Sequence, residues 1–384
     1  MSQRAIATIA GDRPVVHLDD LGRAGGGAVH LAARVLYGGE GAYDSDAIHA
    51  FNRHRPGMPR RPLSAMLSIT LMLSGCAEHL VPPGPPVETP RTSEDAFIMP
   101  DGMRLPYRAW LPKDAPWAVV LALHGMNDSR DAWEYPAPQL SERGVAVFAP
   151  DQRGFGDTTV RGYWPGTSAL VDDAREMARL LRQRYPRAKL FLLGESMGAA
   201  VLMCLAVDPN APRVDGYILV APAVWGRAEM NVFLRSSLWL FANLIPGFRV
   251  SGAAARRVAS DNREAIRRLS QDPLTIHETR FDAVRGLVNL MDAALAAAPR
   301  FREPALFLYG GKDELIPDRA TAATWRGLPH GPIRAFYPGG YHLLLRDHER
   351  ETPIDDILAW MRHPAAGLPS GGDLEAEAWL RGQK

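Results

Sequence analysis

A serine between two glycines is the residue with the clearest chemistry in this sequence. Ser196 lies in the segment GESMG at 194–198, which follows the apolar run KLFLL and precedes the apolar stretch AAVLMCLAV. A strand that turns sharply into a helix exposes such a serine oxygen above the strand ends, and flanking glycines relieve the crowding at the turn. The pattern predicts Ser196 as a nucleophile, with a structural turn serine as the alternative.

A serine hydroxyl attacks well only when a base removes its proton and another group orients that base. Asp313 follows the apolar run ALFLYG in a glycine-containing turn, and His342 follows a short apolar run and two glycines. Both therefore fall at strand ends, and we predict Asp313 as the acid and His342 as the base. The rival candidates are Glu314 and Asp318 for the acid, and His330, His348 and His363 for the base.

An oxyanion hole needs two backbone N–H groups aimed at the negative charge that develops on the substrate. Met197, directly after the nucleophile, supplies one by its position. The second is expected in the loop after the first long apolar run, which reads LALHGM and ends at Met126. We predict Met126 and Met197 as the donors; alternatively, His124-Gly125 is only a tight exit from a strand.

Apolar runs alternate with helical patterns over residues 94–363. The runs are nearly continuous, as expected for strands buried on both faces of a parallel sheet. They occupy 117–123, 144–150, 189–194, 216–222 and 305–310, after a predicted hairpin at 94–110. The alternation predicts an α/β fold with a doubly wound, mostly parallel sheet.

Residues 226–300 break this alternation. They read as helical throughout, so we expect an inserted helical cap. Within it, the stretch 230–248 is unusually apolar, but Arg235 and Asn243 interrupt it and Pro246 ends it, which argues against a membrane span. We expect this stretch to line an acyl-binding groove or touch a lipid surface, with cap-to-core packing as the alternative.

Composition excludes several classes of protein. The 384 residues carry 44 Lys+Arg and 43 Asp+Glu, a net charge of +1, which argues against binding driven by nucleic-acid phosphates. Two cysteines, Cys76 and Cys204, rule out a disulfide framework and a cysteine-built zinc site. The sequence has no phosphate loop, metal-ligand cluster or nucleotide fingerprint, so we expect no metal and no cofactor.

Five motifs, HGMNDS, PDQRGFGDT, GESMG, GGKDELIP and GGYH, occur in an order and spacing that resemble the α/β-hydrolase superfamily. Within it the chain is most similar to the monoacylglycerol lipase and lysophospholipase group, through GESMG, SQDPL at 270–274 and YPGGYH. The resemblance covers 94–363. It implies the α/β-hydrolase fold, a cap over an acyl pocket, and cofactor-free ester hydrolysis through an acyl-enzyme on Ser196, with Asp313 and His342. The pair Met126-Asn127 departs from the small residues common in the family, which affects the expected substrate size.

The N-terminal part reads as a misplaced targeting signal. Residues 58–75 combine two arginines, an apolar stretch and small residues before Cys76, as in a lipoprotein signal. We therefore predict translation from Met58, with 1–57 a non-native extension, and lipidation at Cys76. A proline-rich tether at 76–93 and a C-terminal tail at 364–384 flank the enzyme domain. This places the protein in a bacterial cell envelope, lipid-anchored and facing the periplasm; without a start at Met58 it is cytoplasmic.

The expected partners are a small acyl ester, such as a monoacylglycerol or lysophospholipid, and a membrane surface reached through Cys76. We expect a monomer. The same superfamily includes aminopeptidases, which need an acidic anchor for the substrate amine, as well as thioesterases and carbon–carbon bond hydrolases. The cap carboxylates available as an anchor are Glu229, Asp261, Glu264 and Asp272. A non-catalytic envelope lipoprotein is the alternative from another class.

The predicted start at Met58 is tested by mass spectrometry of the protein purified from its natural source. We expect tryptic peptides from the region after Cys76 and none from residues 1–57. Detection of peptides from 1–57 would contradict the prediction.

Overall fold

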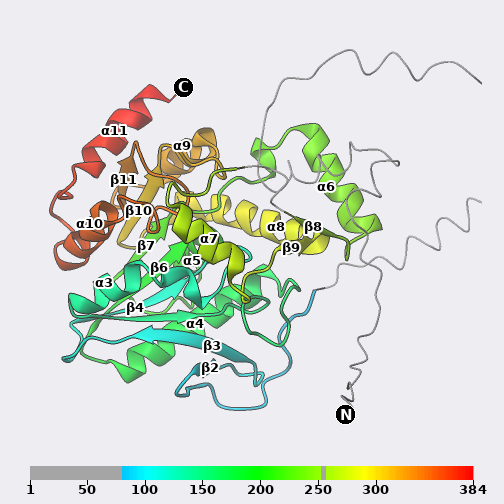
Figure 1. Cartoon of the computed structure of the whole chain (residues 1–384), viewed down its shortest axis with the longest axis horizontal. Coiled ribbons are helices and arrows are strands. Elements are labelled where there is room, and N and C mark those ends of the chain that lie inside the picture. Colours follow the sequence, from blue (N-terminus) through cyan, green and yellow to red (C-terminus); the bar gives the residue numbers. More distant parts are fainter. Residues whose placement is uncertain (1–79, 252–256, 384) are drawn as a thin grey trace, which may run out of the picture.

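The computed structural model describes residues 80–251 and 257–383. A nine-stranded sheet runs through the domain in the order β1-β2-β3-β5-β4-β6-β7-β10-β11, with helices on both faces (Figure 1). The strands are β1 Arg91–Thr92, β2 Ala96–Ile98, β3 Arg104–Trp110, β4 Ala118–Leu123, β5 Val145–Pro150, β6 Lys189–Glu195, β7 Gly216–Val220, β10 Ala305–Gly310 and β11 Ile333–Tyr337.

The sheet is antiparallel at one edge and parallel elsewhere. The predicted hairpin is confirmed as β2 and β3, and β3 joins the sheet by antiparallel pairing with β5. From β5 onward all neighbours pair in parallel. Strands β4, β5, β7 and β10 are buried along their full length, because helices cover both faces. The predicted α/β-hydrolase sheet is confirmed.

Two helix layers enclose the sheet. Apolar side chains of α3 (Pro136–Glu142) and α10 (Glu351–Arg362) pack in the core of one face. The other face is covered by α4 (Thr167–Arg184), α5 (Met197–Ala206), α8 (Phe281–Ala297) and α9 (Asp318–Gly327). All carboxyl ends of the parallel strands therefore open onto the same edge, where the inserted cap lies.

The cap is shorter than predicted and is not helical throughout. It contains α6 (Val232–Leu244) and α7 (Arg263–Gln271), together with a two-stranded ribbon of β8 (Arg249–Ser251) and β9 (Glu278–Arg280). Helix α8, which the sequence assigned to the cap, packs against α5 in the core layer. The apolar surface of α8 is broad enough for a helix of the cap or of the core layer. Its contact with α5 shows that it belongs to the core layer. None of the helices in the described ranges has the length and apolarity of a membrane span.

Residues beyond 363 are part of the packed domain rather than a tail. Helix α11 (Gly372–Gly382) lies along β11 at the edge of the sheet (Figure 1). Trp379 stacks on Phe336 with ring centroids 4.9 Å apart, and Ala376 is fully buried. Trp379 on the short helix α11 therefore covers the outermost strand, β11. Without α11, one apolar face of β11 would be exposed to water.

The described part of the predicted tether also lies against the domain. Val81 donates a backbone hydrogen bond to the carbonyl of Trp164, and Val87 and Glu88 donate to the carbonyl of Pro100. The prolines keep this segment extended, and several of its N–H groups, including that of Gly84, find acceptors on the domain. Cys76 and residues 1–79 lie outside the described residues, so the signal and lipidation stay predictions.

A buried arginine fastens the N-terminal hairpin to α4. The guanidinium of Arg153, 2 % exposed, binds Asp173 through Nε and Nη2 at 2.8 and 2.9 Å. It also binds Asp101 in the hairpin turn at 2.6 and 3.1 Å. Breaking a buried ion pair by removing one partner leaves an uncompensated charge. This cluster therefore contributes strongly to holding the hairpin in place.

Arg153→Met is expected to destabilise the folded domain by about 3–5 kcal/mol, because two buried carboxylates lose their cation. Urea unfolding followed by tryptophan fluorescence measures the change. A loss below about 1 kcal/mol, typical of exposed ion pairs, would contradict this assignment.

Candidate active site

The serine turn joins β6 to α5. Ser196 is the N-cap residue of α5 and has φ 53° and ψ −112°, a region that a non-glycine residue seldom adopts. Its backbone N–H donates to the carbonyl of Val220 on β7 at 2.9 Å, and its carbonyl accepts from Ala223 at 3.0 Å. The strained backbone is thus held in place by bonds to the neighbouring strand.

The two glycines of the turn have no room for a side chain. A Cβ on Gly198 would lie 2.1 Å from the carbonyl oxygen of Leu123, and one on Gly194 would lie 2.5 Å from the backbone N of Ala199. Helix α5 therefore starts in direct contact with the end of β4. This close approach explains the G-x-S-x-G spacing.

Asp313 and His342 come together as the sequence predicted. The Asp313 Oδ2 lies 2.7 Å from Nδ1 of His342, and its Oδ1 accepts backbone N–H bonds from Leu315 and Ile316 at 2.7 and 2.9 Å. Burial lowers the pKa of His342, but the charge and hydrogen bond of Asp313 and the charge of Glu195 together raise it by more, so the net shift is upward. The carboxylate is therefore fixed in orientation and stabilises the charged imidazole.

The rival acids bond to partners other than His342, and the rival bases are exposed. The carboxylate of Glu314 accepts from the backbone N–H of Val258 at 3.0 Å, and Asp318 accepts from the Tyr309 hydroxyl at 2.9 Å. Three rival histidines are exposed at the surface: His330, His348 and His363.

The two predicted oxyanion donors flank the serine turn. Met197 is the first residue of α5, where the helix itself offers its N–H no acceptor. Met126 follows Gly125, and a Cβ on Gly125 would lie 3.4 Å from that of Ser196, so the loop after β4 runs alongside the serine. The structure therefore brings both backbone segments to Ser196.

A buried histidine shapes the loop that carries Met126. The Nε2 of His124 accepts the backbone N–H of Gln152 at 3.1 Å, so the proton of the neutral ring belongs on Nδ1, which lies 2.8 Å from the carbonyl of Gly125. Burial lowers the pKa of His124, which favours the neutral ring. His124 thus has a structural role in the loop.

Sequence reasoning missed a buried cluster of charges under the site. Arg346 binds the carboxylates of Asp128 and Glu195, and all three side chains are at least nine-tenths buried. The sequence offered Glu195 beside the nucleophile without a role, and Arg346 follows three leucines in a segment typical of a strand or helix. Arg346 is 151 positions from Glu195 and 218 positions from Asp128 along the chain, so no local sequence pattern connects them.

The cap segment 257–279 is fastened to the loop after β4. Asn127 donates a side-chain bond to Thr279 at 2.6 Å and accepts the backbone N–H of Ile276 at 2.8 Å. The Ser129 hydroxyl donates to Asp272 at 3.0 Å. Asp272 belongs to the SQDPL motif, so that motif holds the loop that carries Met126.

The same segment is also fastened to the histidine loop. The backbone N–H of Leu343 donates to the carbonyl of Ala259 at 2.8 Å, and the side-chain amide of Asn262 donates to the carbonyl of Arg346 at 2.9 Å. Ser260 donates to Asp347 at 2.6 Å. One stretch of the cap therefore contacts the loops on both sides of Ser196.

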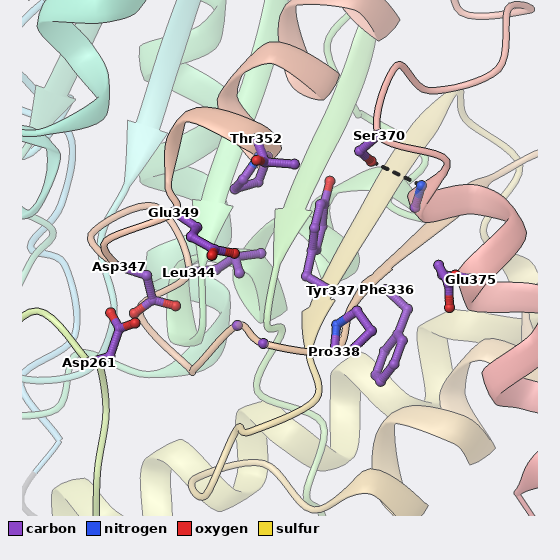
Figure 2. Close-up of a pocket in the computed structure, with 14 residues that line it drawn as sticks. Asp261, Phe336, Tyr337, Pro338, Leu344, Asp347, Glu349, Thr352, Ser370 and Glu375 are labelled. Atoms are coloured by element: carbon purple, nitrogen blue, oxygen red, sulfur yellow. Dashed lines mark hydrogen bonds between the residues drawn. The ribbon is translucent and has the colours of Figure 1, made fainter.

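Three hollows lie near these loops, and one of them, of about 300 Å³, is lined by Asp128, Asp272 and Arg346. The largest of the three, of about 750 Å³, is lined by Asp313, Trp225, Tyr341 and Leu234 of α6, and adjoins the acid of the pair. A smaller one, of about 200 Å³, lies beyond the histidine loop and is lined by Tyr337, Leu344 and several carboxylates (Figure 2). Its lining includes none of Ser196, Asp313 and His342, whereas the lining of the largest hollow includes Asp313 but not Ser196 or His342.

The fold and the arrangement around Ser196 define an α/β-hydrolase. Residues 114–349 match the family described as serine aminopeptidase, S33, and the chain belongs to that Hydrolase_4 family. Within the described residues there is no group of three or more His, Cys, Asp or Glu side chains suited to a metal ion.

The chain is similar to several monoacylglycerol lipases. One from Mycolicibacterium smegmatis is 26 % identical over 274 residues, which cover 70 % of this chain and 96 % of that protein. The monoglyceride lipase of Rattus norvegicus is 25 % identical over 286 residues, covering 73 % and 94 %. A structure of a soluble variant of the Saccharomyces cerevisiae monoglyceride lipase with a substrate analogue has a TM-score of 0.60 at 20 % identity. The match covers 72 % of this chain and 95 % of that one, which shows the shared fold.

Proposed function

We propose that this protein is a serine hydrolase that cleaves lipid carboxylic esters, with a monoacylglycerol or lysophospholipid as the substrate class. The observation that carries the proposal is the strained Ser196 turn at the same sheet edge as the bonded Asp313–His342 pair. The names of the similar proteins, monoacylglycerol and monoglyceride lipases, support the substrate class.

In the proposed reaction, His342 takes the proton of Ser196 as its oxygen attacks the ester carbonyl. Asp313 holds the imidazole through Nδ1, which leaves Nε2 to act as the base. The N–H groups of Met126 and Met197 stabilise the oxyanion. His342 then protonates the departing alcohol, and water attacks the acyl-enzyme to release the acid and restore Ser196.

The outward face of α6 favours a lipid as the source of the ester. Leu234, Leu238 and Ala242 face the domain, while other apolar side chains of the same helix and the turn after it stay exposed. The exposed side chains are Val232, Phe233, Trp239, Leu240, Leu244, Ile245 and Phe248. Helix α6 lies at the outer side of the cap (Figure 1). An apolar face of this kind suits a membrane surface, and a lipid anchor at Cys76, in the bacterial envelope, would keep the enzyme there.

Cleavage of amino-terminal peptide bonds is disfavoured because the cap carboxylates are already bonded. Asp272 accepts from Ser129, and Asp261 accepts the backbone N–H of His348 at 2.9 Å. Glu264 pairs with Arg267 on the exposed face of α7. Glu229 does line the largest hollow, but Arg319 lies 3.4 Å from it and balances its charge.

Ser196→Ala is expected to lower turnover of p-nitrophenyl esters by about 10³-fold or more and to abolish labelling by a fluorophosphonate probe.

Activity in the wild type should rise with pH as His342 loses its proton, with a midpoint above the ordinary histidine value of 6.5. Amino-acid anilides serve as the comparison substrate. Retained esterase activity in the variant, or faster cleavage of anilides than of esters, would overturn the proposal.

Replacing both Phe233 and Trp239 by Ser is expected to slow hydrolysis of a long-chain monoacylglycerol in vesicles without changing hydrolysis of a soluble short-chain ester. These side chains are 74 % and 66 % exposed, so their loss leaves the core intact. Leu374→Ser on α11, where the leucine is 68 % exposed, is the matched control and should affect neither substrate. Equal rates of the double variant and the wild type on vesicles would refute a lipid-contact role for α6.

A further inference from the structure

We propose that Arg346 is a positioning residue that holds the serine turn, the loop after β4 and the histidine loop in one catalytic arrangement. The inference rests on the proposed serine hydrolase function, because it assigns a residue to that same site. It goes beyond the triad and the oxyanion donors, none of which Arg346 belongs to.

A single nitrogen makes the connection. Nη2 of Arg346 donates to Oδ2 of Asp128 at 2.5 Å and to Oε1 of Glu195 at 2.9 Å. The side chains of Arg346, Asp128 and Glu195 are only 5 %, 8 % and 2 % exposed. Little of these side chains reaches water, although Asp128 and Arg346 also line the hollow of about 300 Å³, so water screens the bonds only in part.

Each member of the cluster lies within four positions in the sequence of a residue that takes part in the proposed reaction. Glu195 directly precedes Ser196, Asp128 lies two residues after Met126, and Arg346 lies four residues after His342. A movement of any one of these three loops would lengthen at least one bond to Nη2. The relative positions of the three loops are thus coupled through one guanidinium group. Its hydrogen bonds are directional, whereas an apolar contact would not fix the loops in specific directions.

The cluster of Arg346, Asp128 and Glu195 also affects the pKa of His342. The charged groups that act on its imidazole are Asp313 from the turn after β10, Glu195 at the end of β6, and Arg346 on its own loop. Asp128 from the loop after β4 acts on it through the bond to Arg346. The Glu195 charge raises the pKa of His342 and the Arg346 charge lowers it. Burial raises the pKa of Glu195, and the charge of Arg346 offsets part of that rise, although the net shift stays upward.

The molecule contains a matched control. Arg153 is as buried as Arg346 and also binds two carboxylates, but these lie in the β2–β3 turn and on α4. Arg346→Met and Arg153→Met therefore remove the same kind of charge from two places. A loss of activity caused only by reduced stability would occur in both variants to a similar degree.

The test compares kcat and KM for a soluble p-nitrophenyl ester in the full-length wild type, Arg346→Met, Arg153→Met and Ser196→Ala, with Tm measured for each. Arg346→Met is expected to lower kcat about 10- to 100-fold, with KM changed less than about twofold. Arg153→Met, assayed below its Tm, should keep the wild-type kcat. A folded Arg346→Met variant with wild-type kcat, or an equal loss in Arg153→Met, would overturn the inference.

Glu195→Gln keeps the size of the side chain and provides a second test if Arg346→Met does not fold. It removes a negative charge that raises the pKa of His342, so the acid limb of the kcat/KM profile should move to lower pH. Asp101→Asn, which removes a carboxylate from the Arg153 cluster, should leave the limb in place. An unmoved limb in Glu195→Gln would overturn the inference. An active Ser196→Ala would instead overturn the proposed function itself, so the two failures are distinguishable.

Discussion

The close contact between the start of α5 and the end of β4 is the constraint on which the site depends. It leaves no space for a side chain at Gly194 or Gly198, and it holds Ser196 at a positive φ. The cost of that backbone conformation, about 1–3 kcal/mol, is offset by the surrounding buried sheet. Because parallel strands end at one edge, the turns after β10 and β11 open at the same edge of the sheet as the serine turn.

The main parts of the fold and site could be predicted from local patterns. The apolar runs marked the buried strands, and strand ends marked the positions of Ser196, Asp313 and His342. Contacts between distant segments could not be predicted in this way. Helix α8 has an apolar pattern that suits a cap or a core equally, and its contact with α5 decides the matter. The role of Trp379 was hidden because one aromatic residue on a polar helix carries no periodic signal.

Buried charge was the least predictable part of the structure. Arg153 and Arg346 each lie in the core with two carboxylates, although arginine is ordinarily an exposed residue. Their partners lie 20 to 218 residues away along the chain, so no spacing rule identifies them. One cluster holds a hairpin to a helix, and the other lies among the catalytic loops. The same chemistry therefore has different consequences according to which segments it joins.

The cap is divided between a segment that bonds to the loops around Ser196 and a helix whose outer face stays exposed. The segment 257–279 bonds to the loop after β4 and to the histidine loop, through side chains such as Asp272 and Asn262. The apolar side chains on the outward face of α6 are largely exposed. Substitutions in the segment 257–279 disturb bonds to the loops around Ser196, whereas substitutions on the outward face of α6 do not. Substrate preference can therefore diverge along α6 during evolution while the chemistry proposed for Ser196 is retained.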